Sequence, residues 1–188
     1  MGSMKRIGLD LDGVCYNYSA TACMLLNHYK GYNLDWTQTD SWDWLKSQVS
    51  NNDWQWLWSQ GVKEGLFRYG NIIKGAAEGV KELAKMGKIA VVTSRPDSAR
   101  LVTLDWLSFM EFPISELHIM GHGQNKSTTK VDVAIDDAPH VAEDYIQAGI
   151  PVVLFDRKYN QMVPEQTLLY RAYDWKDVVK KTMMILNG

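Results

Sequence analysis

Asp10-Leu11-Asp12-Gly13-Val14 follows directly on the short apolar run Ile7-Gly8-Leu9. Two carboxylates two positions apart, at the end of a strand-like run, can point into one site if the chain turns there. Gly13 permits such a turn because glycine adopts unusual backbone angles without steric cost. The stretch therefore predicts a strand that delivers Asp10 and Asp12 to a site at its carboxyl end.

A second acidic pair, Asp136-Asp137, ends the apolar run over residues 131–135. Because Mg²⁺ prefers oxygen ligands and neutralises phosphate charge, two strand ends that each deliver acids indicate a magnesium site for phosphate chemistry. Asp136 is the better direct ligand, whereas Asp137 binds through water or orients a neighbouring group. The expected metal-binding residues are Asp10, Asp12, Asp136 and Asp137.

From residue 75 onward, segments with helical and strand-like patterns alternate along the chain. Spacing and capping signals predict helices over 76–86, after Asp97 or Ser98, over 139–148 and over 174–186. β-rich runs predict strands over 88–92, 117–120, 131–135 and 151–155. Such alternation predicts an α/β fold, a Rossmann-like parallel sheet flanked by helices. Ligands of these sheets sit at the carboxyl ends of the strands, where both acidic pairs fall.

Residues 16–74 interrupt this alternation between the first strand and the first crossover helix. The segment is too long for an ordinary connection. We therefore expect a small helical cap over the site, beginning with a helix at 19–30. The predicted division is a core of residues 4–15 and 75–188 and a cap of residues 16–74.

The cap region is rich in tryptophan, since six of the eight in the chain lie between Trp36 and Trp58. We expect most of them to pack the cap's own core and one or two to contact a ligand. A nucleobase stacked on an aromatic ring gains about 1–3 kcal/mol, which would favour nucleotides over sugar phosphates. Phe67 and Tyr69 are further candidates for this contact, and Tyr16 and Tyr18, next to Asp10 and Asp12 in the chain, are expected to line the entrance of the site.

Three residues after the strand at 88–92 are candidates for holding phosphate. Thr93 and Ser94 offer hydroxyls and backbone N–H groups where the strand leads into a helix, a place that holds anions readily. A helix cap is the alternative for this pair. Arg95 pairs with phosphate or another substrate group, or lies in solvent. A cation should also balance the phosphoryl charge, and two lysines shortly before Asp136 are available, Lys126 and Lys130.

Composition limits the remaining classes of function. The net charge of the 188 residues is −2, so no basic field indicates a binder of duplex nucleic acid. No apolar run has the length of a membrane span, and Met1-Gly2-Ser3 reads as a cloning remnant rather than a leader. Cys15 and Cys23 lack the spacing of a metal knuckle or disulfide framework, which favours a reduced, cytoplasmic setting. Structural or surface roles are expected for the three histidines without zinc-like spacing, His118, His122 and His140.

Taken in order, these pieces resemble the four motifs of the haloacid dehalogenase superfamily of phosphatases. Asp-Leu-Asp-Gly-Val at 10–14 matches the first motif, Thr93-Ser94 the second, Lys126 or Lys130 the third and Ile135-Asp136-Asp137 the fourth. Within the superfamily the chain is most similar to the 5′(3′)-deoxyribonucleotidases and their phage and bacterial relatives. This likeness depends on the cap between motifs one and two, on Ile-Asp-Asp followed by Ala-Pro, and on a lysine ten residues upstream.

The resemblance implies roles for the matching residues. Asp10 would be the nucleophile and Asp12 the general acid and base. Magnesium would be held by Asp10, the backbone carbonyl of Asp12, and Asp136. The ten-residue interval favours Lys126 as the third-motif lysine, so phosphate would be held by Thr93, Ser94 and Lys126. The caps of these enzymes place aromatic side chains around the nucleobase, and the family often forms dimers, which leaves a homodimer open.

We therefore predict a magnesium-dependent 5′-nucleotidase that hydrolyses ribo- or deoxyribonucleoside monophosphates through an aspartyl-phosphate. Its expected partner is a small nucleotide, and neither a duplex nucleic acid nor a membrane. One alternative is a phosphatase of the same mechanism that acts on another small ester, such as a sugar phosphate. A second alternative is a protein that binds a nucleotide without turnover, against which the presence of both Asp10 and Asp12 weighs.

Overall fold

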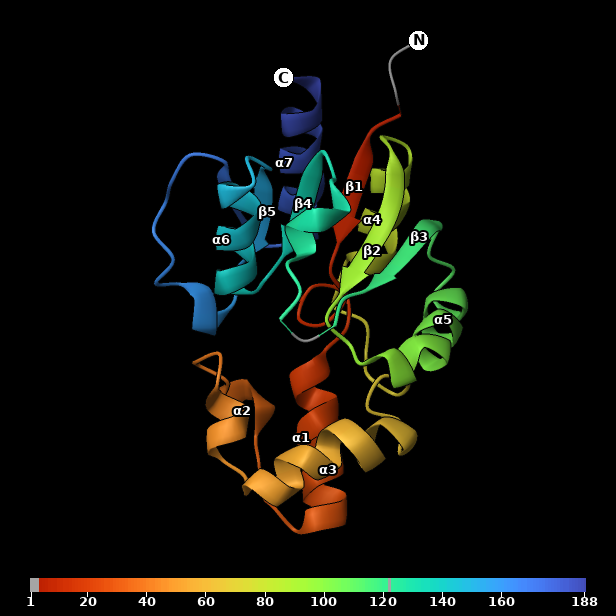
Figure 1. The fold of residues 1–188 in the computed structure, drawn as a ribbon, viewed down its shortest axis with the longest axis vertical. Coiled ribbons are helices and arrows are strands. Elements are labelled where there is room, and N and C mark those ends of the chain that lie inside the picture. Colours follow the sequence, from red (N-terminus) through yellow and green to blue (C-terminus); the bar gives the residue numbers. More distant parts are fainter. Residues whose placement is uncertain (1–3, 122) are drawn as a thin grey trace.

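A six-stranded parallel sheet forms the centre of the computed structural model, which describes residues 4–121 and 123–188 (Figure 1). Neighbouring strands are all parallel and follow the order β3-β2-β1-β4-β5-β6. Their bounds are β1 Arg6–Leu9, β2 Lys88–Thr93, β3 Ile114–Ile119, β4 Val133–Asp136, β5 Val152–Phe155 and β6 Leu169–Ala172. The predicted α/β fold with a Rossmann-like parallel sheet is confirmed. The expectations for Met1-Gly2-Ser3 and His122 lie outside the described residues.

Seven α-helices are present in the described residues, together with short 3₁₀ turns. The helices are α1 Tyr18–Lys30, α2 Trp44–Ser47, α3 Asn51–Lys63, α4 Ala76–Ala84, α5 Arg100–Phe109, α6 Pro139–Gln147 and α7 Trp175–Asn187. The 3₁₀ turns are η1 Trp36–Gln38, η2 Asp97–Ala99, η3 Lys126–Thr129 and η4 Lys158–Asn160. None of the described helices has both the length and the apolar character needed to cross a membrane.

The two faces of the sheet are buried by different helices, because side chains alternate along a strand. Ile7 and Leu9 of β1 belong to a hydrophobic cluster that α4, α5 and α7 complete. Ala90 of β2 and Ala134 of β4 belong to a second cluster, which α6 completes. Burial on both faces explains why the central strands have nearly continuous apolar sequences.

Two local features differ from the sequence predictions. Strand β6 lies outside the predicted strands because it is an edge strand of four residues with only Leu169 and Ala172 buried, so it lacks the pattern of a central strand. The expected cap of α5 is wrong. Neither Asp97 nor Ser98 caps that helix, because both lie in the 3₁₀ turn η2 that precedes it.

Residues 16–74, here called the helical insertion, place α1, α2 and α3 beyond the carboxyl ends of the strands, at the bottom of Figure 1. These helices carry a hydrophobic cluster distinct from the two clusters of the sheet. Trp36 and Trp42 are about half exposed. The other four tryptophans of the insertion pack in or against its cluster, as predicted: Trp44, Trp54, Trp56 and Trp58.

Tyr16 joins the two connections between the insertion and the sheet. It forms isolated β-bridges with Asp12 on one side and Ile72 on the other. Its buried hydroxyl donates to the Leu66 carbonyl at 2.8 Å and accepts from the Gly70 N–H at 2.6 Å. A Cβ at Gly70 would lie 2.1 Å from the Tyr16 ring, so glycine is required for this approach. Tyr16 thus ties the entry and exit of the insertion together.

Replacing Tyr16 by Phe would leave the Gly70 N–H and the Leu66 carbonyl buried without their partner. We expect Tyr16→Phe to lower the free energy of unfolding by about 1–3 kcal/mol. Urea denaturation measures this change, with Tyr69→Phe as the control at an exposed tyrosine. Equal stabilities of the two variants would contradict the role assigned to the Tyr16 hydroxyl.

Candidate active site

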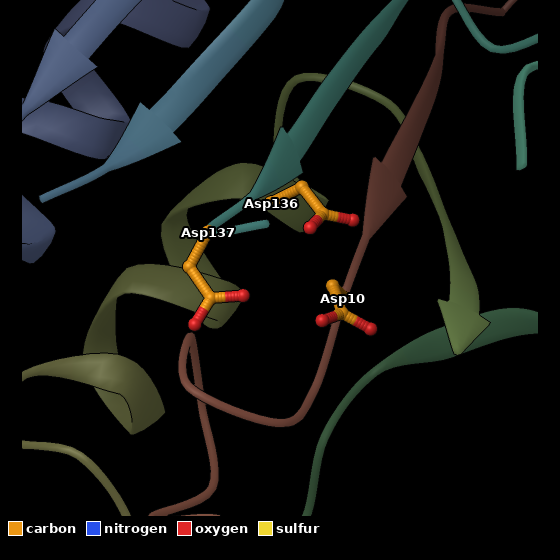
Figure 2. Close-up of side chains that lie close together, drawn as sticks. All are labelled: Asp10, Asp136 and Asp137. Atoms are coloured by element: carbon orange, nitrogen blue, oxygen red, sulfur yellow. The ribbon is translucent and has the colours of Figure 1, made fainter. Parts of the chain in front are cut away.

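Three buried acids meet at the carboxyl ends of β1 and β4. Figure 2 shows Asp10 just after β1 and Asp136 and Asp137 at the end of β4, with their carboxylates directed into one space. One carboxylate oxygen from each residue lies within 4.8 Å of the others. The pairing of β1 with β4 causes this meeting, because Leu9 is in register with Ile135 and the Asp10 N–H donates to the Ile135 carbonyl at 3.0 Å.

Lys126 is the cation that reaches these acids. Its Nζ lies 2.9 Å from Asp10 Oδ1 and 2.8 Å from Asp136 Oδ2, and the side chain is buried. Lys130, the other candidate lysine, is exposed at the end of η3. Of the two lysines suggested by the sequence, the structure therefore brings Lys126 to the acids and leaves Lys130 at the surface.

Burial and mutual repulsion control the protonation of this cluster. Burial raises the pKa of Asp10 well above its ordinary value, Lys126 opposes this rise and Asp136 adds to it. Burial and the charge of Asp136 raise the pKa of Asp137 to about 7. For Lys126, burial favours a lower pKa, but the charges of Asp10 and Asp136 outweigh burial and raise it. The site holds more negative charge than Lys126 neutralises.

The donor set of the cluster fits a hard divalent cation. Three carboxylates and one ammonium group leave an excess of negative charge, and carboxylate oxygens are the ligands that Mg²⁺ prefers. Oδ1 of Asp137 is in addition buried without a hydrogen-bond partner in the described part of the chain. A buried acceptor of this kind is costly unless it has a partner, and a cation held by these three residues would supply one.

Asp12 turns away from this cluster toward Arg95. Arg95 Nη2 donates to Asp12 Oδ1 at 2.8 Å and Nε donates to Oδ2 at 2.9 Å, across 83 residues of sequence. The Asp12 carboxylate is therefore not part of the group of three carboxylates that could hold a metal. Arg95, expected on phosphate or in solvent, is a buried partner of an acid in this structure.

The remaining candidates for phosphate binding follow β2. Thr93 is the last residue of this strand and is buried, and its hydroxyl accepts from the Arg95 N–H at 3.4 Å. Ser94 is exposed. Because β1 lies between β2 and β4, both residues belong to the edge of the sheet at which Asp10 and Asp136 lie.

Sequence reasoning missed a group of site residues in and beside the turn η4, after β5. Arg157 Nε donates to the Gly13 carbonyl at 2.8 Å, and the Tyr159 hydroxyl donates to Asp137 Oδ2. Asn160 donates to the Asp137 carbonyl at 2.9 Å. The same strand-end rule that singled out Asp10 would have found them, since they follow the predicted strand at 151–155.

The helical insertion contacts the site from two directions. Trp42 lies edge-on to His140 and Tyr159, with ring centroids 5.0 and 5.6 Å away, and Lys158 donates to the Thr37 carbonyl at 2.8 Å. Near Asp12, an aromatic group is formed by Tyr18, Trp58 and Phe67, with the Tyr18 ring stacked on the other two. Of the two further candidates for the base contact, Phe67 lies buried in this group and Tyr69 is exposed; of the two residues expected at the entrance, Tyr18 lies in this group and Tyr16 is buried.

Both cysteines are free and buried in the described structure. Burial raises the pKa of Cys15 well above its ordinary value and that of Cys23 to about 11. A thiol of raised pKa is a poor nucleophile at neutral pH, so Cys15 packs beside Asp10 without being a reactive group.

A family model described as 5′ nucleotidase, deoxy (Pyrimidine), cytosolic type C protein matches residues 4–187. The chain belongs to this nucleotidase family. The 5′(3′)-deoxyribonucleotidase of Bacillus subtilis strain 168 is 29% identical over 184 residues, which cover 95% of this chain and 99% of that protein. Family membership and this relative identify the chain as a phosphomonoester hydrolase, as its motifs predicted.

Solved structures of low sequence identity share the fold of this nucleotidase-family chain. A haloacid dehalogenase-like hydrolase from Streptococcus pneumoniae has a TM-score of 0.65 at 14% identity, with 97% of this chain and 100% of that chain covered. The hydrolase YfnB from Bacillus subtilis, solved bound to magnesium, has a TM-score of 0.62 at 14% identity, with 100% of both chains covered. The architecture around the acidic cluster is thus that of the superfamily.

Gly13 is the position at which a small change should disturb this nucleotidase-family site most. Its φ is +83°, and a Cβ there would lie 1.7 Å from Asp137 Oδ2 and 2.9 Å from the Tyr159 hydroxyl. We expect Gly13→Ala to lower the free energy of unfolding by about 1–2 kcal/mol through the backbone and a further 1–3 kcal/mol or so through the clash.

Gly31→Ala is the matched control, because Gly31 has a φ of +72° and open space around its Cβ position. It should show the backbone cost alone. Chemical denaturation of both variants separates the two effects, and the same loss of stability in each would mean that the carboxylate of Asp137 moves freely away from Gly13.

Proposed function

We propose that the chain is a magnesium-dependent 5′-nucleotidase that hydrolyses nucleoside monophosphates, deoxyribonucleotides in particular, through an aspartyl-phosphate on Asp10. The observation that carries the proposal is the buried cluster of Asp10, Asp136 and Asp137 with Lys126 at the carboxyl edge of the sheet. Membership of the nucleotidase family and the deoxyribonucleotidase relative support the choice of substrate.

In the first step, Asp10 attacks phosphorus, and the bond from phosphorus to the nucleoside oxygen breaks as the new bond to Asp10 forms. Lys126 contacts Oδ1 of Asp10 at 2.9 Å, so we assign the attack to Oδ2. Asp12, which starts this step protonated, gives its proton to the departing oxygen and becomes a carboxylate. Thr93, Ser94 and Lys126 hold the phosphoryl oxygens.

In the second step, water attacks the phosphorus of the aspartyl-phosphate while Asp12 takes its proton, and inorganic phosphate and the free Asp10 carboxylate result. Asp10, Asp136, Asp137 and the Asp12 backbone carbonyl would hold Mg²⁺. When bound, this ion offsets the repulsion between the carboxylates and the phosphate dianion.

The helical insertion acts in this proposal as the cap that receives the nucleoside. Tyr18 and Trp58 are partly exposed and pack on the buried Phe67, and stacking of a base on such partly exposed rings contributes about 1–3 kcal/mol. A sugar phosphate has no base to gain this energy, which favours the nucleotide among small esters.

A panel of esters tests the proposal directly. Phosphate release is measured from 5′- and 3′-nucleoside monophosphates, ribo and deoxy, beside sugar phosphates, with magnesium and with excess chelator. We expect magnesium-dependent release that is fastest with deoxyribonucleotides, and a loss of at least about 10³-fold in kcat for Asp10→Asn. Faster release from sugar phosphates would overturn the substrate, and tight nucleotide binding without release would favour a binding protein.

The two lysines provide a second test of the site. Lys126→Met should lower kcat by about 10²–10³-fold, because it removes a buried charge that stabilises the transition state. Lys130→Met should change kcat by less than about twofold, because Lys130 is exposed. Steady-state kinetics compare them, and circular dichroism confirms that both fold. A larger loss in Lys130→Met would move the phosphate-binding role to that residue.

A further inference from the structure

The Arg95 guanidinium group is fully buried, whereas a side chain that only binds phosphate would be open to the substrate. Arg95 stands directly after the exposed Ser94, yet its own side chain has no exposed surface. Burying a guanidinium group is costly unless its N–H groups are paired. The partners of Arg95 therefore indicate what this residue does.

The hydrogen bonds of Arg95 fix one particular carboxylate. Two parallel bonds, at 2.9 and 2.8 Å, engage both oxygens of Asp12, and a third runs from Nη1 to the Thr103 hydroxyl at 3.1 Å. A bidentate pair of this kind fixes the plane of the carboxylate as well as its place. The Asp12 side chain is 23% exposed, so it remains accessible while Arg95 holds it from the buried side.

Two aromatic rings hold the guanidinium group in turn. Its central carbon lies 4.8 Å from the ring centroid of Tyr16 and 4.5 Å from that of Phe67. Tyr16 joins the two connections of the helical insertion, and Phe67 belongs to the insertion's hydrophobic cluster. The orientation of Asp12 is thereby linked through Arg95 to the base of the insertion.

We propose that Arg95 is a positioning residue for Asp12, which directs this carboxylate at the leaving oxygen of the substrate, and not a ligand of the phosphoryl group. This inference rests on the proposed function, because it presupposes that Asp12 transfers protons. Arg95 acts through Asp12 alone, and Thr103, Tyr16 and Phe67 keep it in place.

The leaving group distinguishes a positioning residue from a phosphate ligand. The 5′-oxygen of a nucleotide leaves as an alkoxide unless it is protonated, so its departure depends on a well-placed acid. 4-Nitrophenolate leaves without a proton. A misplaced Asp12 should therefore lower kcat/KM for a nucleotide much more than for 4-nitrophenyl phosphate, since kcat/KM reports only the steps through the departure of the leaving group.

The experiment compares Arg95→Gln and Arg95→Lys with wild type on deoxyribonucleoside monophosphates and on 4-nitrophenyl phosphate. Both variants should lose about 10²-fold or more in kcat/KM for the nucleotide and less than about fivefold for the aryl ester. Lysine is included because it keeps the charge but cannot form the two parallel bonds. Inhibition by inorganic phosphate should change by less than about twofold in either variant.

Three further variants make the result decisive. Asp12→Asn should show the same dependence on the leaving group, and Arg100→Lys, at an exposed arginine of α5, should show none. Thr103→Val keeps Arg95 but removes one of its partners, so it should shift the ratio in the same direction by a smaller factor. This variant tests the proposal even if both Arg95 variants fail to fold.

Equal losses on the two esters, or weaker inhibition by phosphate, would overturn the positioning role and return Arg95 to phosphate binding or to a purely structural role. A wild type that hydrolyses 4-nitrophenyl phosphate but no nucleotide would overturn only the proposed substrate, and the comparison would then use an alkyl phosphate that it does hydrolyse. A wild type inactive on every ester would overturn the proposed function together with this inference.

Discussion

The contact of the Lys126 ammonium group with Asp10 and Asp136 is the interaction on which the rest of the site depends. Parallel strands that end at one edge of a sheet bring their terminal side chains together. Here those side chains are Asp10, Asp136 and Asp137, which are buried and have carboxylate oxygens within 4.8 Å of one another. Lys126 lies 2.8–2.9 Å from two of them. Breaking a buried ion pair by removing one partner typically lowers the free energy of unfolding by about 3–5 kcal/mol. Lys126 therefore contributes both to the stability of the fold and to the charge of the site.

Other polar and charged side chains around the site have defined hydrogen-bond partners. Arg95 pairs with Asp12, while Arg157 donates to the Gly13 carbonyl in the turn between Asp12 and the insertion. Tyr159 donates to one oxygen of Asp137 and leaves the other without a partner among the described residues. Lys126 thus pairs with Asp10 and Asp136, while one oxygen of Asp137 keeps no partner within the described ranges, and a divalent cation held by the three carboxylates would balance the remaining negative charge.

The sheet and most of the acidic cluster could be predicted from the sequence. Ligands of parallel sheets lie at the carboxyl ends of the strands, and strand ends can be located from local apolar patterns. Apolar runs that end in Asp10, Thr93 and Asp136 indicate both the parallel sheet and the edge at which these residues meet. The structure brings Asp10, Asp136 and Asp137 together, and Lys126 joins them at the ten-residue interval suggested by the family resemblance.

The remaining features depend on tertiary contacts that leave no local pattern. Arg95 meets Asp12 across 83 residues of sequence, so its side-chain partner could not be read from the chain. Edge strand β6 has only two buried residues, so its sequence lacks the alternation of apolar and polar residues that indicates a strand. The residues after β5 do stand at a predicted strand end, but which of them reaches Asp137 depends on the turn there, whose conformation is set by Asn160 bonds to the Phe155 and Asp137 carbonyls.

The junction between the sheet and the helical insertion is where, in the proposed reaction, the leaving oxygen is protonated. In the proposed reaction, the core holds the phosphoryl group and the insertion holds the base, so the oxygen that joins them lies between the two. Asp12, Arg95 and Phe67 occupy this junction, with Arg95 in contact with both of the others. In the proposed reaction, Arg95 would thus connect the insertion, through Phe67, to the acid that protonates the leaving oxygen, and would hold that acid in place before the nucleotide arrives.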